Sequence, residues 1–240
     1  MLKLSALDLV YPRSCFGCGL TCNQDEGFLC WECLAEVIFV KPPFCSLCGD
    51  PISGKIDHAY VCYFCTSLPR FFDKARSSIL YDGILRKALQ AFKYQAGLWL
   101  YHDLVSLIYA CTTAQLNVDR IDMVTCVPLH ARRRRKRGYN QSYLLAKGLS
   151  SKIDKPLKKN LLKRIRSTKS QTDLTARERI TNLEAAFKAK KGACVKDQHI
   201  LLVDDIMTTG VTVNECARTL KEAGASEVSV VTVARGSQRF

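Results

Sequence analysis

Two adjacent carboxylates and a threonine-rich turn lie close together near the end of the chain. Asp204 and Asp205 follow an apolar run, and the residues of the turn are Thr208, Thr209, Gly210, Val211 and Thr212. Residues 200–203 read as a buried parallel strand, and residues 212–223 have helical periodicity. A strand-to-helix turn presents backbone N–H groups and the positive end of the helix dipole to an anion. Because the carboxylates can accept hydrogen bonds from two vicinal hydroxyls, the segment predicts a sugar-phosphate site, whereas a plain capped turn explains only one threonine.

The cysteines suggest a second chemistry. The chain has 13 cysteines, and those before residue 66 include four Cys-x-x-Cys pairs: Cys15/Cys18, Cys30/Cys33, Cys45/Cys48 and Cys62/Cys65. Two such pairs separated by a dozen or so residues are typical of a tetrahedral Cys₄ zinc site. We therefore expect two structural zinc ions, with redox-active dithiols as the alternative. Chain order favours the first four cysteines as one site and the last four as the other, but the spacing leaves a cross-braced pairing open.

The other cysteines have simpler explanations. Four of them lie among apolar neighbours and are expected to be buried thiols: Cys111, Cys126, Cys194 and Cys216. Cys22 and His58 lie beside the two predicted zinc sites as spare ligands.

Length and composition limit the number and size of the domains that can hold these sites. A chain of 240 residues with 48% hydrophobic content can bury one α/β core and carry a small appended module. We place the boundary near residues 67–70, giving domains 1–68 and 69–240. About sixty-five residues form little core, so the small domain is expected to be held by metal rather than by apolar burial. No apolar run approaches the ~18 residues of a membrane span, and the first ten residues are weak for a secretory signal, so a cytoplasmic location is expected.

The large domain alternates strand-like and helix-like segments. Strands are predicted at residues 75–81, 122–127, 161–164, 185–189, 200–203 and 228–233. Helices are predicted at residues 82–94, 98–114, 140–151, 175–182 and 212–223. This alternation favours an α/β fold with a parallel, doubly wound sheet.

The chain is strongly basic. Its formal net charge is +14, which eight thiolates and two Zn²⁺ would lower by about four. The densest cluster is the run Arg132, Arg133, Arg134, Arg135, Lys136 and Arg137. A charge run is usually a solvated face, but this one follows a predicted strand, where α/β sheets place their ligand loops. Pyrophosphate, a nucleic-acid backbone and solvent therefore all remain possible partners.

Residues 200–212 resemble the fingerprint of the type I phosphoribosyltransferases: four apolar residues, two acids, two further positions and Thr-Thr-Gly-x-Thr. The resemblance implies that Asp204 and Asp205 hold the ribose hydroxyls of phosphoribosyl pyrophosphate (PRPP). It also implies that residues 208–212 hold the 5′-phosphate, with Mg²⁺ carried on the pyrophosphate.

The whole chain resembles the ComF/GntX family, which joins a double zinc ribbon to a phosphoribosyltransferase domain. Beside the cysteines, three blocks carry the resemblance. They are residues 127–132 with 137–141, residues 164–171 with Leu174, Arg179, Asn182, Ala186 and Phe187, and the segment at 200–212. Ala131 stands where the family usually has proline. Membership implies a role in natural transformation, with single-stranded DNA and other competence proteins, such as a helicase or translocase, as partners.

Two functions follow as hypotheses. In the first, the protein is a Mg²⁺-dependent transferase in which Asp204, Asp205 and Arg137 act at the reacting ribose and the departing pyrophosphate. In the second, it is a non-catalytic accessory that binds nucleic acid or a partner and whose PRPP pocket regulates it. Arg132 to Arg135 are the predicted DNA contacts. A transferase also needs a hood over the ribose, and residues 71–101 or the ribbons must supply it. His130 is either a general acid–base or structural.

Overall fold

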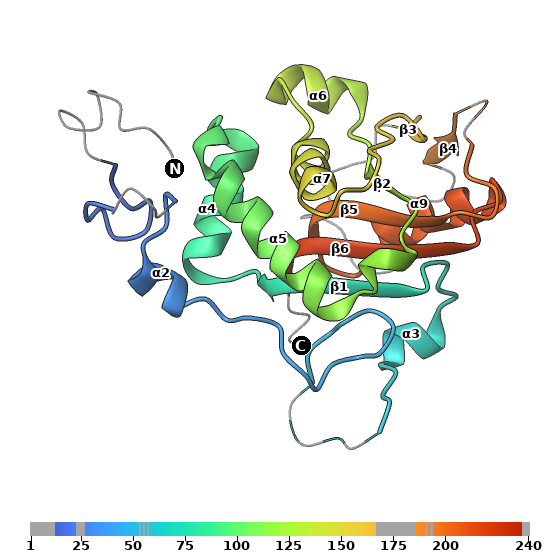
Figure 1. The fold of residues 1–240 in the computed structure, drawn as a ribbon, viewed down its shortest axis with the longest axis horizontal. Helices are drawn as coiled ribbons and strands as arrows, with labels where there is room; N and C mark the ends of the chain where they lie inside the picture. Colours follow the sequence, from blue (N-terminus) through green and yellow to red (C-terminus); the bar gives the residue numbers. More distant parts are fainter. Residues whose placement is uncertain are drawn as a thin grey trace.

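A four-stranded parallel sheet forms the centre of the molecule (Figure 1). The computed structural model describes residues 13–22, 27–52, 54, 56, 58–166, 186–190, 192 and 194–236. The sheet has the strand order β1-β6-β5-β2. Its strands are β1 (Lys74–Leu80), β2 (Met123–Cys126), β5 (His199–Met207) and β6 (Glu227–Arg235). All three pairings are parallel, which confirms the predicted α/β class.

Helices cover one face of this sheet. They are α4 (Gly83–Tyr94), α5 (Tyr101–Gln115), which follows the 3₁₀ turn η1 (Leu98–Leu100), and α7 (Gln141–Lys152). Leu201 and Val203 of β5 point into the apolar cluster under these helices. Side chains alternate along a strand, so Ile200 and Leu202 enter the cluster on the opposite face. Both faces of β5 are therefore buried, as its continuous apolar run predicts.

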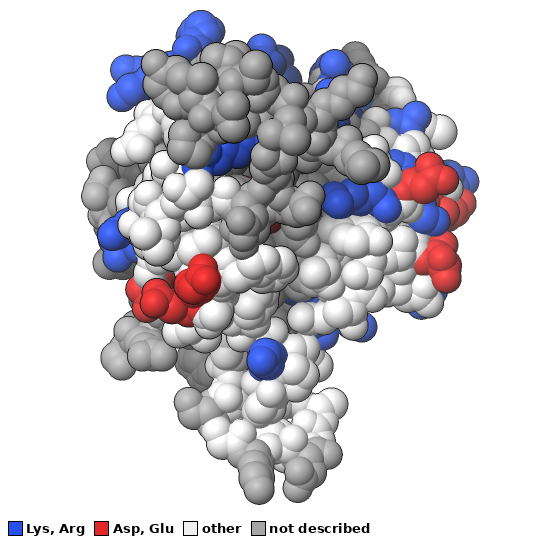
Figure 2. Space-filling view, turned by 60° about the vertical axis from the view of Figure 1, so that its left-hand side comes forward, with Lys and Arg blue, Asp and Glu red and all other residues white. Residues whose placement is uncertain are grey.

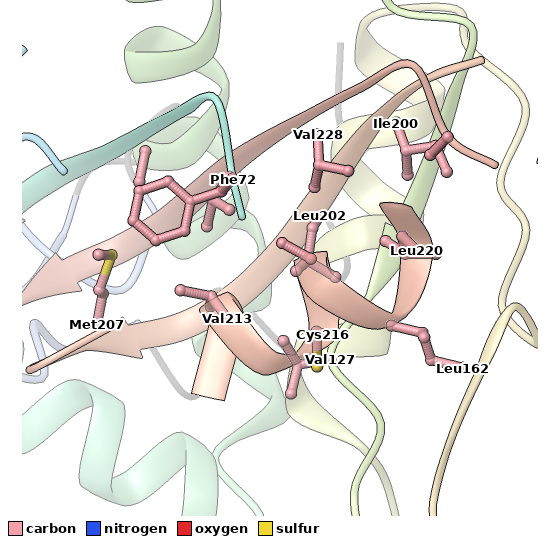
Figure 3. Packing of buried hydrophobic residues seen from close by; sticks show 14 of the residues in the cluster. Phe72, Val127, Leu162, Ile200, Leu202, Met207, Val213, Cys216, Leu220 and Val228 are labelled. Carbon is pink, nitrogen blue, oxygen red and sulfur yellow. The ribbon is translucent and has the colours of Figure 1, made fainter. Parts of the chain in front are cut away.

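The opposite face carries α9 (Val211–Glu222) (Figure 3). Val213, Cys216 and Leu220 recur at helical spacing along α9 and are buried against Leu202 and Val228 of the sheet. Cys216 is one of the predicted buried thiols, and Cys111 and Cys126 are buried as well. Cys194 is exposed, contrary to prediction, because the neighbouring Val195 takes the buried position.

Two predicted strands lie outside the parallel sheet. β3 (Leu162–Arg164) and β4 (Phe187–Ala189) form a separate antiparallel pair, so their assignment to the doubly wound sheet is wrong. Only alternate residues of β3 are buried, which is the pattern of a strand with one solvated face. The helix predicted at residues 175–182 lies outside the described residues.

Within the described part of the larger domain, one α-helix was not predicted. The basic run forms α6 (Ala131–Arg137), which begins at the N-cap His130 and ends at Gly138 with φ = 85°. His130 Nδ1 accepts from the Arg132 N–H at 3.3 Å, so this side chain has a capping role. Among the described residues, no helix is long and apolar enough to cross a bilayer.

The N-terminal part contains two similar ribbons, which we name by their cysteines. The first ribbon contains Cys15, Cys18, Cys30 and Cys33 and the helix α2 (Trp31–Ala35); the second contains Cys45, Cys48, Cys62 and Cys65 and the helix α3 (Tyr63–Ser67). Their backbone hydrogen bonds match: Phe16 N–H donates to Phe28 O at 2.7 Å, and Ser46 N–H donates to Tyr60 O at 2.7 Å. The first ribbon lies beside α4 and the second lies along β1 (Figure 1).

The second ribbon is part of the domain core. Its four cysteines share one apolar cluster with sheet and α9 residues such as Phe72, Met207 and Val228. The expectation that metal alone would hold the ribbons is therefore wrong for the second one, because the core of the larger domain supplies the apolar surface that sixty-five residues lack.

Candidate functional site

The eight predicted zinc ligands gather into two groups of four. Each group follows chain order, with all four sulfur atoms within 4.8 Å of one another, so the sequential pairing holds and the cross-braced one does not. The sulfurs of Cys18 and Cys30 are 3.7 Å apart, and those of Cys48 and Cys62 are 3.6 Å apart. A tetrahedron with ~2.3 Å zinc–sulfur bonds has edges of about 3.8 Å. Both groups therefore fit structural zinc. Cys22 is buried close to the first group and His58 is exposed, and neither is among the four.

Backbone amides point at the sulfurs in both groups. Cys30 N–H donates to Cys15 Sγ at 3.3 Å, and Cys62 N–H donates to Cys45 Sγ at 3.3 Å. Such donors stabilise the thiolate form that binds metal. A positively charged side chain of the sheet also lies beside the second group, because the Arg235 guanidinium of β6 is 3.7 Å from Cys48 Sγ.

The paired carboxylates lie within β5 rather than after it. The strand was predicted to end at residue 203, but β6 continues as its partner, and Asp204 and Met207 pair with Thr232 and Arg235. Both carboxylates are buried, with Asp204 8% and Asp205 4% exposed. They therefore sit at the carboxyl end of a rigid strand, the edge at which parallel sheets bind ligands.

Asp204 is held by neighbours from two elements. Its Oδ1 accepts from Ser142 Oγ of α7 at 2.7 Å and from the Asp205 N–H at 3.0 Å. Burial, with the nearby Asp205 charge as the second cause, raises the pKa of Asp204 to about 7. This carboxyl therefore changes its charge near neutral pH.

Asp205 has one free acceptor. Its Oδ1 forms an ion pair with Lys93 Nζ of α4 at 3.1 Å. Its Oδ2 is buried and has no hydrogen-bond partner among the described residues. A buried carboxylate oxygen without a donor is costly, so this atom is suited to a hydroxyl that a ligand brings.

The turn after β5 leads directly into α9. Gly210 is the N-cap, with φ = 76°, and as a glycine it has no side chain to cap the helix. A Cβ at Gly210 would lie 2.7 Å from Met207 Cε, so both conformation and space favour glycine here. The Val211 N–H makes a long hydrogen bond to Thr209 Oγ1 at 3.5 Å. The helix N-terminus therefore follows a glycine N-cap within a threonine-rich turn, which is the arrangement of an anion site.

A cavity of about 330 Å³ joins these parts. Asp204, Asp205, Thr208 and Thr212 line it, whereas Thr209, Gly210 and Val211 do not. Sequence reasoning missed several lining residues from other elements, which are Tyr81, Gln90, Lys93, Tyr94, Asn140, Gln141, Ser142 and Arg164. Helix α4 lies inside residues 71–101, the segment predicted to supply a hood, so the sequence indicated this region. Nothing in the sequence marks Lys93 as a partner of Asp205.

Helix α6 divides the basic run into two faces. Arg133 and Arg137, four residues apart and hence on one side of the helix, line the cavity. Arg132, Arg134, Arg135 and Lys136 are exposed. Arg137 stacks on the Tyr94 ring at 4.8 Å and hydrogen-bonds to Gln141, which orients it at the cavity wall. Helix α6 lies at the top of Figure 1, and Figure 2 shows Lys and Arg side chains at the same end of the molecule.

Comparisons with known proteins agree with both halves of this description. The model of the phosphoribosyl transferase domain matches residues 140–239, and that of the double zinc ribbon domain matches residues 6–66. Neither match covers residues 67–139, so the boundary between 68 and 69 stays a prediction.

Several curated relatives match over most of the chain. Competence protein F of Haemophilus influenzae is 32% identical over 230 residues, covering 92% of this chain and 96% of that protein. DNA utilization protein YhgH of Escherichia coli K12 is 29% identical, covering 95% and 99%. Competence protein ComFC of Bacillus subtilis is 29% identical, covering 86% and 84%. With its two cysteine ribbons joined to a phosphoribosyltransferase sheet, the chain belongs to the ComF/GntX family.

Proposed function

We propose that this protein binds PRPP with Mg²⁺ at the carboxyl end of β5 and acts in the cytoplasm during DNA uptake. The observation that carries the proposal is the buried pair Asp204 and Asp205, one oxygen of which has no donor among the described residues, shortly before a helix N-terminus whose N-cap is a glycine. Vicinal hydroxyls of a ligand can donate hydrogen bonds to the carboxylates, and a 5′-phosphate can bind at the turn of residues 208–212. A ribose 5-phosphate offers both groups at this spacing.

In the proposed transferase, each side chain has a definable task. Asp204 and Asp205 hold the ribose hydroxyls, with Ser142 and Lys93 fixing their positions. Arg137 and Arg133 present positive charge to the pyrophosphate as it departs. Mg²⁺ would neutralise part of the pyrophosphate charge when bound.

The exposed face of α6 suggests how DNA is engaged. Arg132, Arg134 and Arg135 point away from the cavity and can meet phosphates of single-stranded DNA. Arg133, included in the predicted DNA contacts, lines the cavity instead and is assigned to the pyrophosphate. The relatives named for competence and DNA utilization support this role, in which other competence proteins such as a helicase or translocase are the expected partners.

A second candidate function is a non-catalytic accessory whose PRPP pocket regulates DNA or partner binding. The division of α6 into two faces favours it, because DNA and PRPP can then bind without sharing arginines. The two candidates separate in one assay. A transferase releases pyrophosphate from PRPP when DNA or free bases are added, and an accessory does not.

Calorimetry of PRPP with Mg²⁺ tests the central claim. Asp204→Ala/Asp205→Ala should weaken binding on the order of a hundredfold, since hydrogen bonds to charged groups contribute ~1.5–3 kcal/mol each. Asp119→Asn, on the exposed turn η2 (Val118–Arg120), is the matched control and should bind as the wild type does. Equal binding by the double variant, or no binding by the wild type, would refute the proposal.

The raised pKa of Asp204 adds a pH signature. Hydroxyl donors favour the ionised carboxylate, so PRPP affinity should fall by up to about tenfold per unit as pH drops below about 7. The stability of the unliganded protein should change in the opposite sense. A folded pKa above the unfolded value contributes stability at low pH, which is lost as pH rises through about 7. Asp204→Asn should remove both dependences.

Salt dependence tests the DNA face. Arg132→Ala/Arg134→Ala/Arg135→Ala should reduce the log–log salt slope for single-stranded DNA by about 2, at ~0.7 per phosphate contact. Arg133→Ala/Arg137→Ala is the matched control and should weaken PRPP binding with little change in slope. An unchanged slope in the triple variant would assign those three arginines to solvent.

A further inference from the structure

The segment that leaves the second ribbon is fastened to the start of α9. Asn214, in the first turn of α9, makes two hydrogen bonds to it: its Oδ1 accepts from Phe71 N–H at 2.8 Å, and its Nδ2 donates to Pro69 O at 3.0 Å. The same turn of α9 follows Gly210, where the 5′-phosphate is proposed to bind. Asn214 therefore fixes the position of the phosphate turn relative to the linker at residues 69–71.

Arg70 connects the same two places a second time. Its guanidinium donates to Phe64 O at 2.9 Å, inside helix α3 of the second ribbon. The Nη1 atom lies 3.8 Å from the position that a Cβ on Gly210 would take. The side chain also packs over the Phe72 ring at 5.8 Å. One side chain thus contacts the ribbon next to Cys65 and lies beside the turn at Gly210.

A third connection runs through the sheet. Arg235, at the end of β6, forms an ion pair with Asp50 at 2.9 Å and donates to Cys48 O at 3.2 Å. Its register partner on β5 is Met207, and Gly236 N–H donates to Met207 O at 2.9 Å. Met207 is the residue before the phosphate turn. The second ribbon therefore contacts β6 through Arg235, and β6 in turn pairs with the residue of β5 that precedes the turn.

The first ribbon is attached elsewhere. Phe28 N–H donates to Asp103 Oδ2 of α5 at 3.1 Å, and Leu29 is buried under α4 and α5. The chain therefore contains its own control, because two similar cysteine sites are joined to different parts of the domain.

We propose that the second ribbon positions the phosphate turn, with Asn214 and Arg70 as positioning residues, so that zinc retention at its four cysteines and PRPP binding stabilise each other. The proposal rests on the proposed PRPP site. Coupling of this kind is reciprocal, so PRPP must raise the zinc affinity of the second site by the factor that zinc adds to PRPP affinity. The first site should be indifferent to PRPP.

Zinc extraction provides the measurement. Zinc-loaded full-length protein is titrated to equilibrium with a zinc-selective chromogenic chelator in Mg²⁺, with and without PRPP. PRPP should raise the chelator concentration needed to remove one of the two zinc ions about fivefold or more and leave the other unchanged. Cys18→Ser, which alters only the exposed ligand of the first site, should retain the protected ion.

Asn214→Ala separates positioning from general stability. It should keep both zinc ions without PRPP, bind PRPP at least about fivefold more weakly and lose the protection. Arg70→Met, which keeps the stem over Phe72, should act in the same direction and serves if Asn214→Ala does not fold. Asn117→Ala, which removes a cap on η2 at Asp119 N–H, is the matched control and should keep the protection.

The outcomes are distinguishable. If the wild type binds PRPP in the calorimeter but neither zinc ion is protected, or if Asn214→Ala and Arg70→Met both keep full protection, the positioning role is refuted while the PRPP site stands. If the wild type binds no PRPP, both proposals fail together.

Discussion

The two cysteine ribbons have the same local structure and different surroundings. In each ribbon, the first Cys-x-x-Cys pair is followed directly by a glycine with positive φ, Gly19 at 77° and Gly49 at 67°. Both glycines donate to the carbonyl of the first cysteine at 2.9 Å. The first ribbon nevertheless keeps Cys18 exposed, with Cys15, Cys30 and Cys33 in a cluster of their own, whereas all four cysteines of the second ribbon belong to the domain core.

This difference shows that one metal-binding motif can serve two structural purposes. The first ribbon packs against the larger domain through apolar residues such as Leu29, but its cysteines stay outside that core. The cysteines of the second ribbon are part of the domain core, so its metal site lies within that core. If metal alone held the small domain, a chelator would unfold that domain and nothing else. Because the second ribbon is part of the core, a chelator should also loosen β1, β6 and the phosphate turn.

The largest effect is expected from the cysteines themselves. Cys45→Ser, at a fully buried position, should remove several kcal/mol of unfolding free energy from the whole α/β domain, because structural zinc binding contributes directly to folding. Cys18→Ser should loosen the first ribbon and leave the midpoint of the α/β domain nearly unchanged. Denaturant unfolding can be followed by Trp99 fluorescence in a Trp31→Phe background, since the chain has two tryptophans. Equal loss in both variants would break the comparison.

The next effect concerns the buried cation beside Cys48. Arg235→Met should cost about 1.5–3 kcal/mol, the contribution of a hydrogen bond to a charged group, because Asp50 is partly exposed. It leaves Asp50 without its partner and removes positive charge from the second cysteine site. Arg120→Met, which breaks an ion pair of an exposed arginine with Glu227, is the control and should cost less than about 1 kcal/mol. Similar unfolding midpoints for the two variants would contradict a structural role for Arg235.

The smallest and most closely matched test uses the two glycines. Gly19→Ala and Gly49→Ala carry the same penalty for positive φ, about 1–2 kcal/mol. A Cβ at Gly19 meets nothing within 4 Å, but one at Gly49 lies 2.7 Å from the Ala75 carbonyl oxygen of β1. Gly49→Ala should therefore cost more than Gly19→Ala by at least about 1 kcal/mol, since backbone must move. Thermal unfolding of both variants measures the difference, and a difference near zero would mean that the second ribbon yields to β1 without strain.

The sequence alone determined what depends on neighbours along the chain. Cys-x-x-Cys spacing identifies the eight thiols suited to zinc, although it leaves their pairing open, and the run from Ile200 to Thr212 specifies a strand, two acids and an anion-binding turn. Periodicity located most of the helices and strands, because side-chain burial repeats at 3.6 or 2 residues within a single element. These features need no knowledge of the rest of the chain.

Tertiary structure decided which distant residues meet. Arg235 reaches Cys48 across 187 positions, and Asn214 reaches Phe71 across 143, and neither pairing leaves a pattern in the sequence. The same holds for Lys93 beside Asp205, and for the division of α6, which follows from the side of the helix that faces the sheet. The reason is physical: local spacing fixes local geometry, whereas the burial of a ribbon or the partner of a charge depends on how whole elements pack, to which every other element contributes.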